Sequence, residues 1–216
     1  MDDIHTEKSN SSEITLNDVM TSYRRYARVY DQLFGFSLED GRVKLLNAVH
    51  RLAPLSILEM GVGTGLLLPR YPVNAAVVGV DISRHMLDQA QQRVHRHGLT
   101  NVTLQQQDCE SLNFPNETFD CVVLPYVLSV TPNPAQLLAE ALRTCKPEGR
   151  VLAVNHFSGS PFWAWIERLA SPLAAKIGFR SAFSIDQILS SRMHVEDIES
   201  ANLFGLSKVL IIRRVP

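Results

Sequence analysis

A glutamate and three glycines at alternate positions follow an apolar segment in the first third of the chain. The apolar segment, residues 55–58, leads directly to Glu59, and the glycines are Gly61, Gly63 and Gly65. This order is typical of a buried parallel strand that ends in a loop. Glycine lets such a loop approach a ligand closely because it has no Cβ. The simpler alternative is a glycine-rich turn between a strand and a helix.

The spacing of these glycines argues against a dinucleotide site. The G-x-G-x-x-G fingerprint of dinucleotide-binding loops requires its third glycine at the position of Leu66. Glu59 would repel a pyrophosphate, which binds at helix N-termini where negative charge is favoured. The same carboxylate suits a ligand that carries an ammonium group. S-adenosylmethionine, a nucleoside with a cationic amino-acid tail, has this chemistry, and we expect it as the cofactor.

A second carboxylate stands at the end of the next predicted strand. Residues 75–80 are apolar and rich in valine, which is typical of a strand buried on both faces, and Asp81 follows them directly. Asp81 comes 20 residues after Gly61, and a carboxylate at this offset can accept hydrogen bonds from both ribose hydroxyls. Its alternative role is local, beside Ser83, which is the predicted N-cap of the next helix.

Two further predicted strands end in polar or aromatic candidates. Asp108 follows the strand predicted at residues 102–106, and we expect its carboxylate to meet the adenine amino group. An ordinary loop carboxylate is the alternative. Tyr126 follows the apolar strand predicted at residues 119–124. The other residues assigned to the cofactor at these strand ends are Ile82, Met86, Cys109, which would supply a backbone N–H, and Pro125.

The alternation of strands and helices predicts an α/β fold that brings these strand ends together. We expect helices at residues 37–52, 83–97 and 135–144, a fifth strand at 150–155, and β segments at 195–203 and 206–213 that form a hairpin. This pattern predicts a Rossmann-like, doubly wound sheet of seven strands with an antiparallel C-terminal edge hairpin. Ligands bind such sheets outside the carboxyl ends of the strands. We expect one domain over residues 1–216.

Composition disfavours several classes of function. The 216 residues are 45% apolar and 20% charged, which is ordinary for a soluble globular protein. A net charge of −1 gives no general attraction to nucleic acid or to an anionic membrane. The cysteines, Cys109, Cys121 and Cys145, are odd in number and widely spaced, which predicts reduced thiols in a cytoplasmic protein without a metal site. No apolar run is long enough to span a membrane.

A polar leader at residues 1–12, expected to be disordered, precedes a predicted amphipathic helix at residues 14–34. Its apolar side chains recur at spacings of three and four, while Arg24 and Arg28 lie largely off that stripe. Such a helix can be a lid packed on the domain, or it can lie in an anionic lipid interface with its aromatic face down. A second helix, predicted at residues 162–177, is rich in large apolar side chains.

The strand ends together resemble the class I S-adenosylmethionine-dependent methyltransferases over residues 55–154. The motifs behind this resemblance are the E-x-G-x-G-x-G loop and the V-D-I-S that contains Asp81. The flanking segments are similar to the bacterial phosphatidylethanolamine N-methyltransferases. These segments are Tyr-Ala-Arg-Val-Tyr-Asp-Gln-Leu-Phe-Gly at 26–35, Pro-Tyr-Val-Leu-Ser-Val at 125–130, Val-Asn-His-Phe at 154–157, Trp-Ile-Glu-Arg-Leu at 165–169 and Gly-Phe-Arg-Ser at 178–181.

The resemblance implies stepwise methylation of phosphatidylethanolamine toward phosphatidylcholine. It implies a cytoplasmic enzyme that associates reversibly with the inner face of the cell membrane, with the helix at residues 14–34 binding the anionic surface and closing the site. Phospholipid would then be the partner, without nucleic acid or metal.

Five residues are candidates for handling the acceptor. His156 is the best-placed general base, or else a structural histidine. Tyr26 and Tyr126 could hold alkylated ammonium products by cation–π attraction. Tyr30 could do the same or hydrogen-bond the methionine carboxylate of the cofactor. Arg180 is the candidate donor to the lipid phosphate, or else a solvated loop residue.

Other functions remain open on the sequence alone. A methyltransferase of the same fold could act on another amphiphile, such as an ornithine lipid amine or a quinone ring. A membrane-binding protein without turnover is a different class, and the intact Glu59 and Asp81 argue against it. A dehydrogenase is disfavoured by Glu59 and Leu66. The sequence leaves open the number of methyl groups added, the exact lipid, the use of a general base and the oligomeric state.

Overall fold

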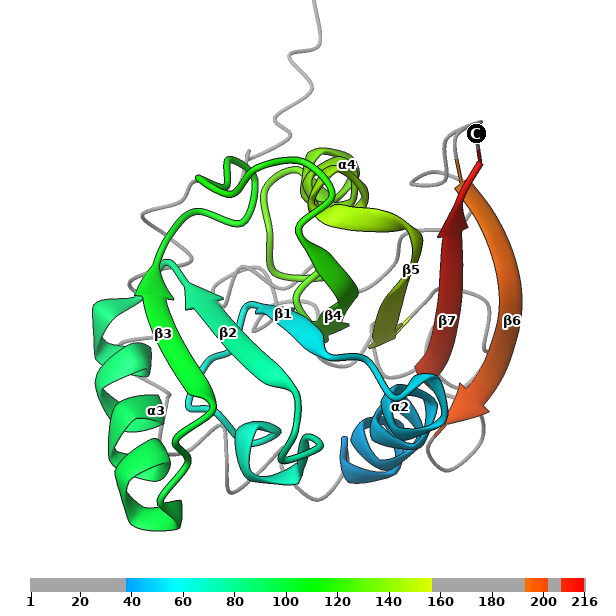
Figure 1. The fold of residues 1–216 in the computed structure, drawn as a ribbon. Helices are drawn as coiled ribbons and strands as arrows, with labels where there is room; N and C mark the ends of the chain where they lie inside the picture. Colours follow the sequence, from blue (N-terminus) through cyan, green and yellow to red (C-terminus); the bar gives the residue numbers. More distant parts are fainter. Residues whose placement is uncertain (1–37, 157–192, 202–206, 216) are drawn as a thin grey trace, which may run out of the picture.

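The computed structural model describes residues 38–156, 193–201 and 207–215. Their core is a seven-stranded sheet in the order β3-β2-β1-β4-β5-β7-β6, which runs from left to right in Figure 1. The strands are β1 (Ser56–Met60), β2 (Ala76–Asp81), β3 (Val102–Gln106), β4 (Phe119–Pro125), β5 (Cys145–His156), β6 (Met193–Ala201) and β7 (Ser207–Arg214). The helices are α2 (Glu39–Leu52), α3 (Arg84–His97) and α4 (Pro134–Thr144), with the short 3₁₀ helix η1 (Leu68–Arg70).

Strand pairing confirms the predicted fold class. β1 through β5 pair in parallel, whereas β7 runs antiparallel to β5, and β6 runs antiparallel to β7. The order reverses direction at β1, because β2 lies on one side of it and β4 on the other. In a doubly wound sheet this reversal opens a crevice at the carboxyl ends of the two strands, where ligands bind.

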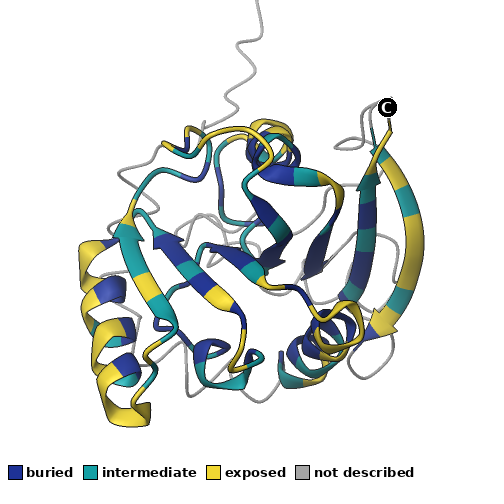
Figure 2. Ribbon diagram, viewed as in Figure 1, coloured by how far each residue is buried: buried dark blue, intermediate teal, exposed yellow. Residues whose placement is uncertain are grey.

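The central strands are apolar on both faces because helices cover both. Side chains of a strand alternate between faces, and Ile57 packs with α2 and α3 while Leu58 packs with α4. The side chains of β4 alternate in the same way: Val123 faces the side covered by α2 and α3, and Leu124 faces the side covered by α4. Figure 2 shows the consequence: the middle strands are dark blue, while the edge strand β6 is largely exposed.

Local signals set the helix ends close to the predicted positions. The Ser83 side chain accepts a hydrogen bond from the Met86 N–H at the start of α3, and Gly98 ends that helix with a φ of 60°. Pro134 occupies the first turn of α4 after Asn133, whose side chain accepts from Gln136 N–H.

The strand boundaries differ modestly from those predicted. β5 begins at Cys145 instead of residue 150, with a shift of register opposite Phe119–Cys121. β6 spans residues 193–201 instead of 195–203, and β7 spans 207–214 instead of 206–213. The leader at residues 1–12 and the helices predicted at 14–34 and 162–177 lie outside the described residues, so those expectations stay predictions.

Candidate active site

A pocket lies at the carboxyl ends of β1, β2 and β4, where the order of the sheet reverses. Its walls include most of the residues predicted for the cofactor: Glu59, Gly61, Gly63, Asp81, Ile82, Met86, Asp108, Cys109 and Pro125. Tyr126, predicted for the acceptor, also lines it. The fold therefore brings together side chains that are up to 67 residues apart in the sequence, from Glu59 to Tyr126.

The three glycines of the loop have different surroundings, although all have positive φ angles: 73° at Gly61, 55° at Gly63 and 76° at Gly65. A Cβ on Gly61 would lie 2.6 Å from a methyl group of Val127, and one on Gly65 would lie 2.7 Å from Leu68 Cδ1. A Cβ on Gly63 would meet nothing within 4 Å. The loop is thus closely packed at its two ends, while Gly63 faces open space where a ligand can approach the backbone.

Asp81 has the local role that the sequence offered as one alternative, while its ribose-binding role stays a prediction. Its Oδ2 accepts a hydrogen bond of 2.8 Å from the Gly63 N–H, and its Oδ1 accepts one of 2.9 Å from the Ser83 N–H. The carboxylate therefore fixes the glycine loop to the end of β2. Burial raises the pKa of Asp81, and the backbone hydrogen bonds oppose that rise. A carboxylate has about four lone-pair sites, so accepting capacity is left for the hydroxyls of a ligand.

Glu59 is buried to 1% exposure at the end of β1, and its Oε2 has no hydrogen-bond partner in the described part of the chain. Burial raises the pKa of Glu59 to about 8; Asp81 adds to the rise, while Tyr71 and Arg42 oppose it. The Tyr71 hydroxyl is buried beside Glu59 and opposes the rise more than Arg42 does. A buried carboxylate costs free energy unless it is paired, so this geometry fits a cationic group as the missing partner.

Tyr126 has a backbone conformation that is uncommon for a residue with a side chain. Its φ is 59°, and such strain is concentrated at functional sites. The Tyr126 hydroxyl donates to the Leu38 carbonyl at 3.1 Å and lies 3.4 Å from Ser207 Oγ. A Cβ on Gly41 would lie 2.1 Å from this hydroxyl, so the glycine makes room for it. The hydroxyl therefore joins the start of α2 to β7, a role that the sequence did not predict.

The loops after β3 and β4 are joined to each other beside the pocket. Glu110 accepts hydrogen bonds from the Thr131 hydroxyl and, at 2.7 Å, from the Asn133 N–H. Asp108 accepts the Glu110 N–H at 2.9 Å, which leaves its second carboxylate oxygen for other donors. Cys109 is buried, and burial raises the pKa of its thiol to about 12. A thiol at that pKa is not a nucleophile at neutral pH, so the side chain of Cys109 serves packing, and its backbone N–H contact with the cofactor stays a prediction.

Arg42 on α2 is the main lining residue that the sequence analysis missed. It shares the buried face of the helix with Leu45, Leu46 and Val49, at spacings of three, four and seven. A charged residue on an apolar helix face is the signal that could have found it. The other lining residues that were not predicted are Leu38, Val62, Thr64, Leu66, Leu67, Val127, Val130, Thr131, Pro132 and Leu137.

Several predicted residues are not placed in this pocket. Gly65 packs against α3, where its Cβ would meet Ala90 at 3.1 Å. His156 ends β5, where its backbone pairs with Ser207. The side chain of His156 lies outside the described residues, as do Tyr26, Tyr30 and Arg180, so their roles stay predictions.

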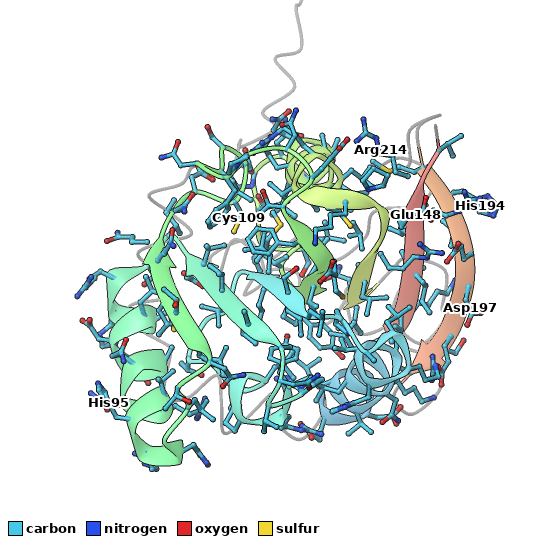
Figure 3. The ribbon with its side chains drawn as sticks, in the orientation of Figure 1. His95, Cys109, Glu148, His194, Asp197 and Arg214 are labelled. Carbon is cyan, nitrogen blue, oxygen red and sulfur yellow. The ribbon has the colours of Figure 1, made fainter. Side chains whose placement is uncertain are left out.

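Other ionisable side chains lie away from the pocket. Figure 3 shows Cys109 inside the molecule, whereas His95 on α3 and His194 and Asp197 on β6 point outward. Within residues 38–156, 193–201 and 207–215, no group of three or more His, Cys, Asp or Glu residues is arranged to hold a metal ion. No helix among these residues is long and apolar enough to cross a membrane.

The chain is similar to known methyltransferases in sequence. Residues 58–153 match the family model described as a methyltransferase domain. A phosphatidylethanolamine N-methyltransferase from Cereibacter sphaeroides is 36% identical over 203 residues, which cover 92% of this chain and 98% of that protein. A ubiquinone/menaquinone biosynthesis C-methyltransferase from Proteus mirabilis is 32% identical over 104 residues, which cover 46% of this chain and 41% of that protein.

Solved structures share the fold at low sequence identity. An S-adenosylmethionine-dependent methyltransferase from Aquifex aeolicus superposes with a TM-score of 0.62 at 16% identity, covering 88% of this chain and 98% of that one. A methyltransferase from Thermotoga maritima, described as a possible histamine N-methyltransferase, superposes with a TM-score of 0.67 at 20% identity, covering 90% and 99% of the two chains.

Proposed function

The chain belongs to the S-adenosylmethionine-dependent methyltransferases, in the family of the phosphatidylethanolamine N-methyltransferases, and we propose that its acceptor is the amino group of a phosphatidylethanolamine headgroup. The cofactor of this enzyme is S-adenosylmethionine, as expected from Glu59 and the glycine loop. The observation that supports this acceptor is the extent of the similarity to the Cereibacter sphaeroides enzyme, which covers 92% of this chain. The similarity to the quinone methyltransferase is limited to 46% of it.

The residues of the pocket fit this cofactor at both of its ends. We assign Glu59 to the ammonium group of the methionine part, since Glu59 is buried with an unpaired oxygen. Asp81 is assigned to the ribose hydroxyls and Asp108 to the adenine amino group. The glycine loop approaches the cofactor most closely at Gly63, where no Cβ contact limits it.

Methyl transfer from the sulfonium of the cofactor is an in-line displacement that depends mainly on positioning. Holding two reactants in the correct geometry supplies a large share of the rate enhancement. The acceptor amine must lose a proton, and burial near a positive charge lowers its pKa from the value of about 10.4 typical of a lysine-like ammonium. A strong base is therefore not essential. His156 is proposed as the residue that accepts the proton, because β5 ends at the same edge of the sheet.

Most of the residues proposed to handle the headgroup and the membrane lie outside the described part of the chain. Arg180 is proposed to donate to the lipid phosphate, and Tyr26 with Tyr126 to hold the methylated ammonium products. Tyr126 lines the pocket, and Tyr30 is proposed to contact the cofactor.

We also propose that the enzyme works in the cytoplasm on the inner face of the membrane, with the helix predicted at residues 14–34 binding anionic lipid. Arg24→Glu combined with Arg28→Glu should then weaken cosedimentation with anionic vesicles, and unchanged binding would reject this role.

Lipid analysis of cells that express the protein tests the acceptor. The host should contain phosphatidylethanolamine but none of its methylated derivatives, and membrane lipids are examined by mass spectrometry. We expect monomethylated, dimethylated or trimethylated phosphatidylethanolamine to appear with the wild-type chain and to be absent with Glu59→Gln. Methylation of a quinone or an ornithine lipid without methylated phosphatidylethanolamine would contradict the proposal.

A further inference from the structure

The glycine loop of the pocket is bound by two neighbouring elements, β2 and α3. On the β2 side, the Gly63 N–H donates to Asp81 Oδ2 at 2.8 Å. From α3, Arg93 Nη1 donates to the Thr64 carbonyl at 2.6 Å and to the Thr64 hydroxyl at 3.4 Å. Thr64 lines the pocket, whereas Arg93 does not. Arg93 can therefore influence the pocket only through the loop that it holds.

The other backbone contacts of the loop come from β2 or from the loop itself. The Gly61 and Val62 N–H groups both donate to the Val80 carbonyl at 2.9 Å. The Gly65 N–H donates to the Val62 carbonyl, also at 2.9 Å. The contact with Arg93 therefore ties the loop to a further element of the fold, the helix that follows β2.

Helix α3 approaches the loop closely at this point. Ala90, one turn before Arg93, is fully buried, and a Cβ on Gly65 would lie 3.1 Å from the Ala90 Cβ. Residues three apart lie on the same side of a helix, so the small side chain of Ala90 lets the long side chain of Arg93 reach Thr64. Thr64 is only 6% exposed and Arg93 is half-buried. A hydrogen bond from a charged donor is stronger than one between neutral groups.

A loop with three glycines needs such contacts to keep one conformation. Glycine populates more backbone conformations than other residues, so holding it in one costs more entropy. Gly61, Gly63 and Gly65 all have positive φ angles. A loop that is not held in the free protein has to be ordered when the ligand binds. The apparent affinity then falls with the fraction of molecules in which the loop is already in the binding conformation.

We infer that Arg93 is a positioning residue for the cofactor: its contact with Thr64 keeps the glycine loop of the free protein in the conformation that receives the cofactor. This inference rests on the S-adenosylmethionine cofactor and is independent of the lipid acceptor. The alternative is that the contact only contributes to overall stability. In that case, loss of Arg93 would lower the free energy of unfolding and leave the affinity of the folded protein for the cofactor unchanged.

Two measurements on Arg93→Met separate these roles. Calorimetric titration with S-adenosylhomocysteine should show an affinity roughly 10- to 100-fold weaker than that of wild type, the usual range for a hydrogen bond from a charged group. Hydrogen exchange, followed by mass spectrometry, should be faster than in wild type in the peptide that contains residues 61–66 of the ligand-free protein. With saturating ligand, this peptide should exchange alike in the two proteins, because the bound ligand orders the loop.

Matched variants complete the test. Arg96→Met makes the same substitution one turn further along α3, at an exposed residue that does not line the pocket. Its affinity should stay within about 3-fold of wild type, with unchanged exchange in the loop. Arg93→Lys keeps the charge but not the planar guanidinium, so its affinity should be only about 3- to 10-fold weaker than that of wild type. This variant decides the question if Arg93→Met does not fold.

Three results would overturn the inference. They are a wild-type affinity in the Arg93 variants, loop exchange equal to that of wild type in their ligand-free forms, and an equal loss of affinity in Arg96→Met. Exchange in the ligand-free protein requires neither cofactor nor lipid, so the role of Arg93 is judged separately from the cofactor and from the proposed acceptor.

Discussion

Two carboxylates on adjacent strands of the sheet have opposite surroundings. Asp120, near the start of β4, accepts hydrogen bonds from the Leu55 N–H, the Ser56 N–H and hydroxyl, and Lys146 Nζ, at 2.7 to 3.1 Å. Glu59, at the end of β1, is more deeply buried and has an oxygen without any partner among the described residues. At the amino end of β4, the carboxylate of Asp120 is fully paired with neighbouring groups. At the carboxyl end of β1, the carboxylate of Glu59 has an unpaired oxygen.

The pKa values of the two groups reflect this difference. Burial alone would raise the pKa of Asp120, but the hydrogen bonds from Lys146 and Ser56 outweigh it and the pKa falls below its usual value. Burial raises the pKa of Glu59 to about 8 because nothing of comparable strength compensates it. A native protein keeps an unsatisfied buried group when a ligand or a function requires it. Asp120 is thus a structural group, whereas Glu59 keeps a buried, unpaired oxygen, which supports its proposed role in binding the cofactor's ammonium.

The largest expected effect concerns cofactor affinity. Glu59→Gln keeps the size of the side chain but removes the charge that faces the cofactor's ammonium. Loss of one partner of a buried charged pair typically costs 2–5 kcal/mol, so affinity for S-adenosylhomocysteine should fall roughly 30- to 5,000-fold. Calorimetric titration measures it. Asp120→Asn is the control and should bind within about 3-fold of wild type. An equal loss of affinity in Glu59→Gln and Asp120→Asn would contradict the distinction between a cofactor-binding Glu59 and a structural Asp120.

The second effect is a change of stability with pH at Glu59. Its folded pKa of about 8 lies above the unfolded value of about 4.3, so between these pH values the folded state binds more protons. The free energy of unfolding contributed by this group therefore falls as pH rises from about 4.3 to 8. Glu59→Gln removes that fall, and its stability relative to wild type should increase by roughly 3–4 kcal/mol between pH 5 and pH 8. Denaturant unfolding of the ligand-free proteins checks this, and a constant difference would be inconsistent with a buried unpaired acid.

Asp120 should show the opposite dependence with a smaller magnitude. Its folded pKa lies below the unfolded value of about 3.9, so its contribution is present above that value and is lost as pH falls through the folded pKa. Asp120→Asn should lower the free energy of unfolding by roughly 1–2 kcal/mol at pH 7. The deficit should shrink below about pH 4. Urea unfolding at pH 7 and pH 3.5 tests this, and a deficit that stays the same at both values would reject it.

The smallest expected effect concerns the hydroxyl of Tyr126. Tyr126→Phe removes the hydrogen bond to the Leu38 carbonyl but keeps the ring under Arg42. Thermal unfolding should show a loss of about 1 kcal/mol, as for one buried hydrogen bond. The rate of methyl transfer should change by less than about 3-fold, because the hydroxyl is already engaged with the Leu38 carbonyl and Ser207. A loss of about 100-fold in kcat with normal stability would instead show that the hydroxyl takes part in the chemistry.

The sequence predicts the sheet and the cofactor edge well because both depend on local patterns. Apolar runs identify the buried strands, and the offset between Gly61 and Asp81 places a carboxylate at the end of β2. The fold then brings both to one pocket. Parallel strands force this outcome, since all of their carboxyl ends meet at one edge.

Features that depend on tertiary partners were not accessible from local patterns. The lack of a partner for Glu59 Oε2 depends on where Tyr71 and Arg42 come to lie. The link from Tyr126 to Leu38 joins residues 88 positions apart. The start of β5 at Cys145 results from pairing with Phe119, which overrides the Pro-Glu-Gly segment that disfavours a strand. Arg42 is the exception, because a charged residue on an apolar helix face was visible in the sequence.

Transfer of a labelled methyl group from S-adenosylmethionine to vesicles of phosphatidylethanolamine tests most directly whether the protein methylates this lipid through Glu59. The purified wild-type protein and Asp120→Asn should both give labelled methylated phosphatidylethanolamine at similar rates with saturating cofactor. Glu59→Gln should give at least about 100-fold less at a cofactor concentration near the wild-type KM. Equal transfer by Glu59→Gln, or no labelled phosphatidylethanolamine product with the wild-type protein, would contradict it.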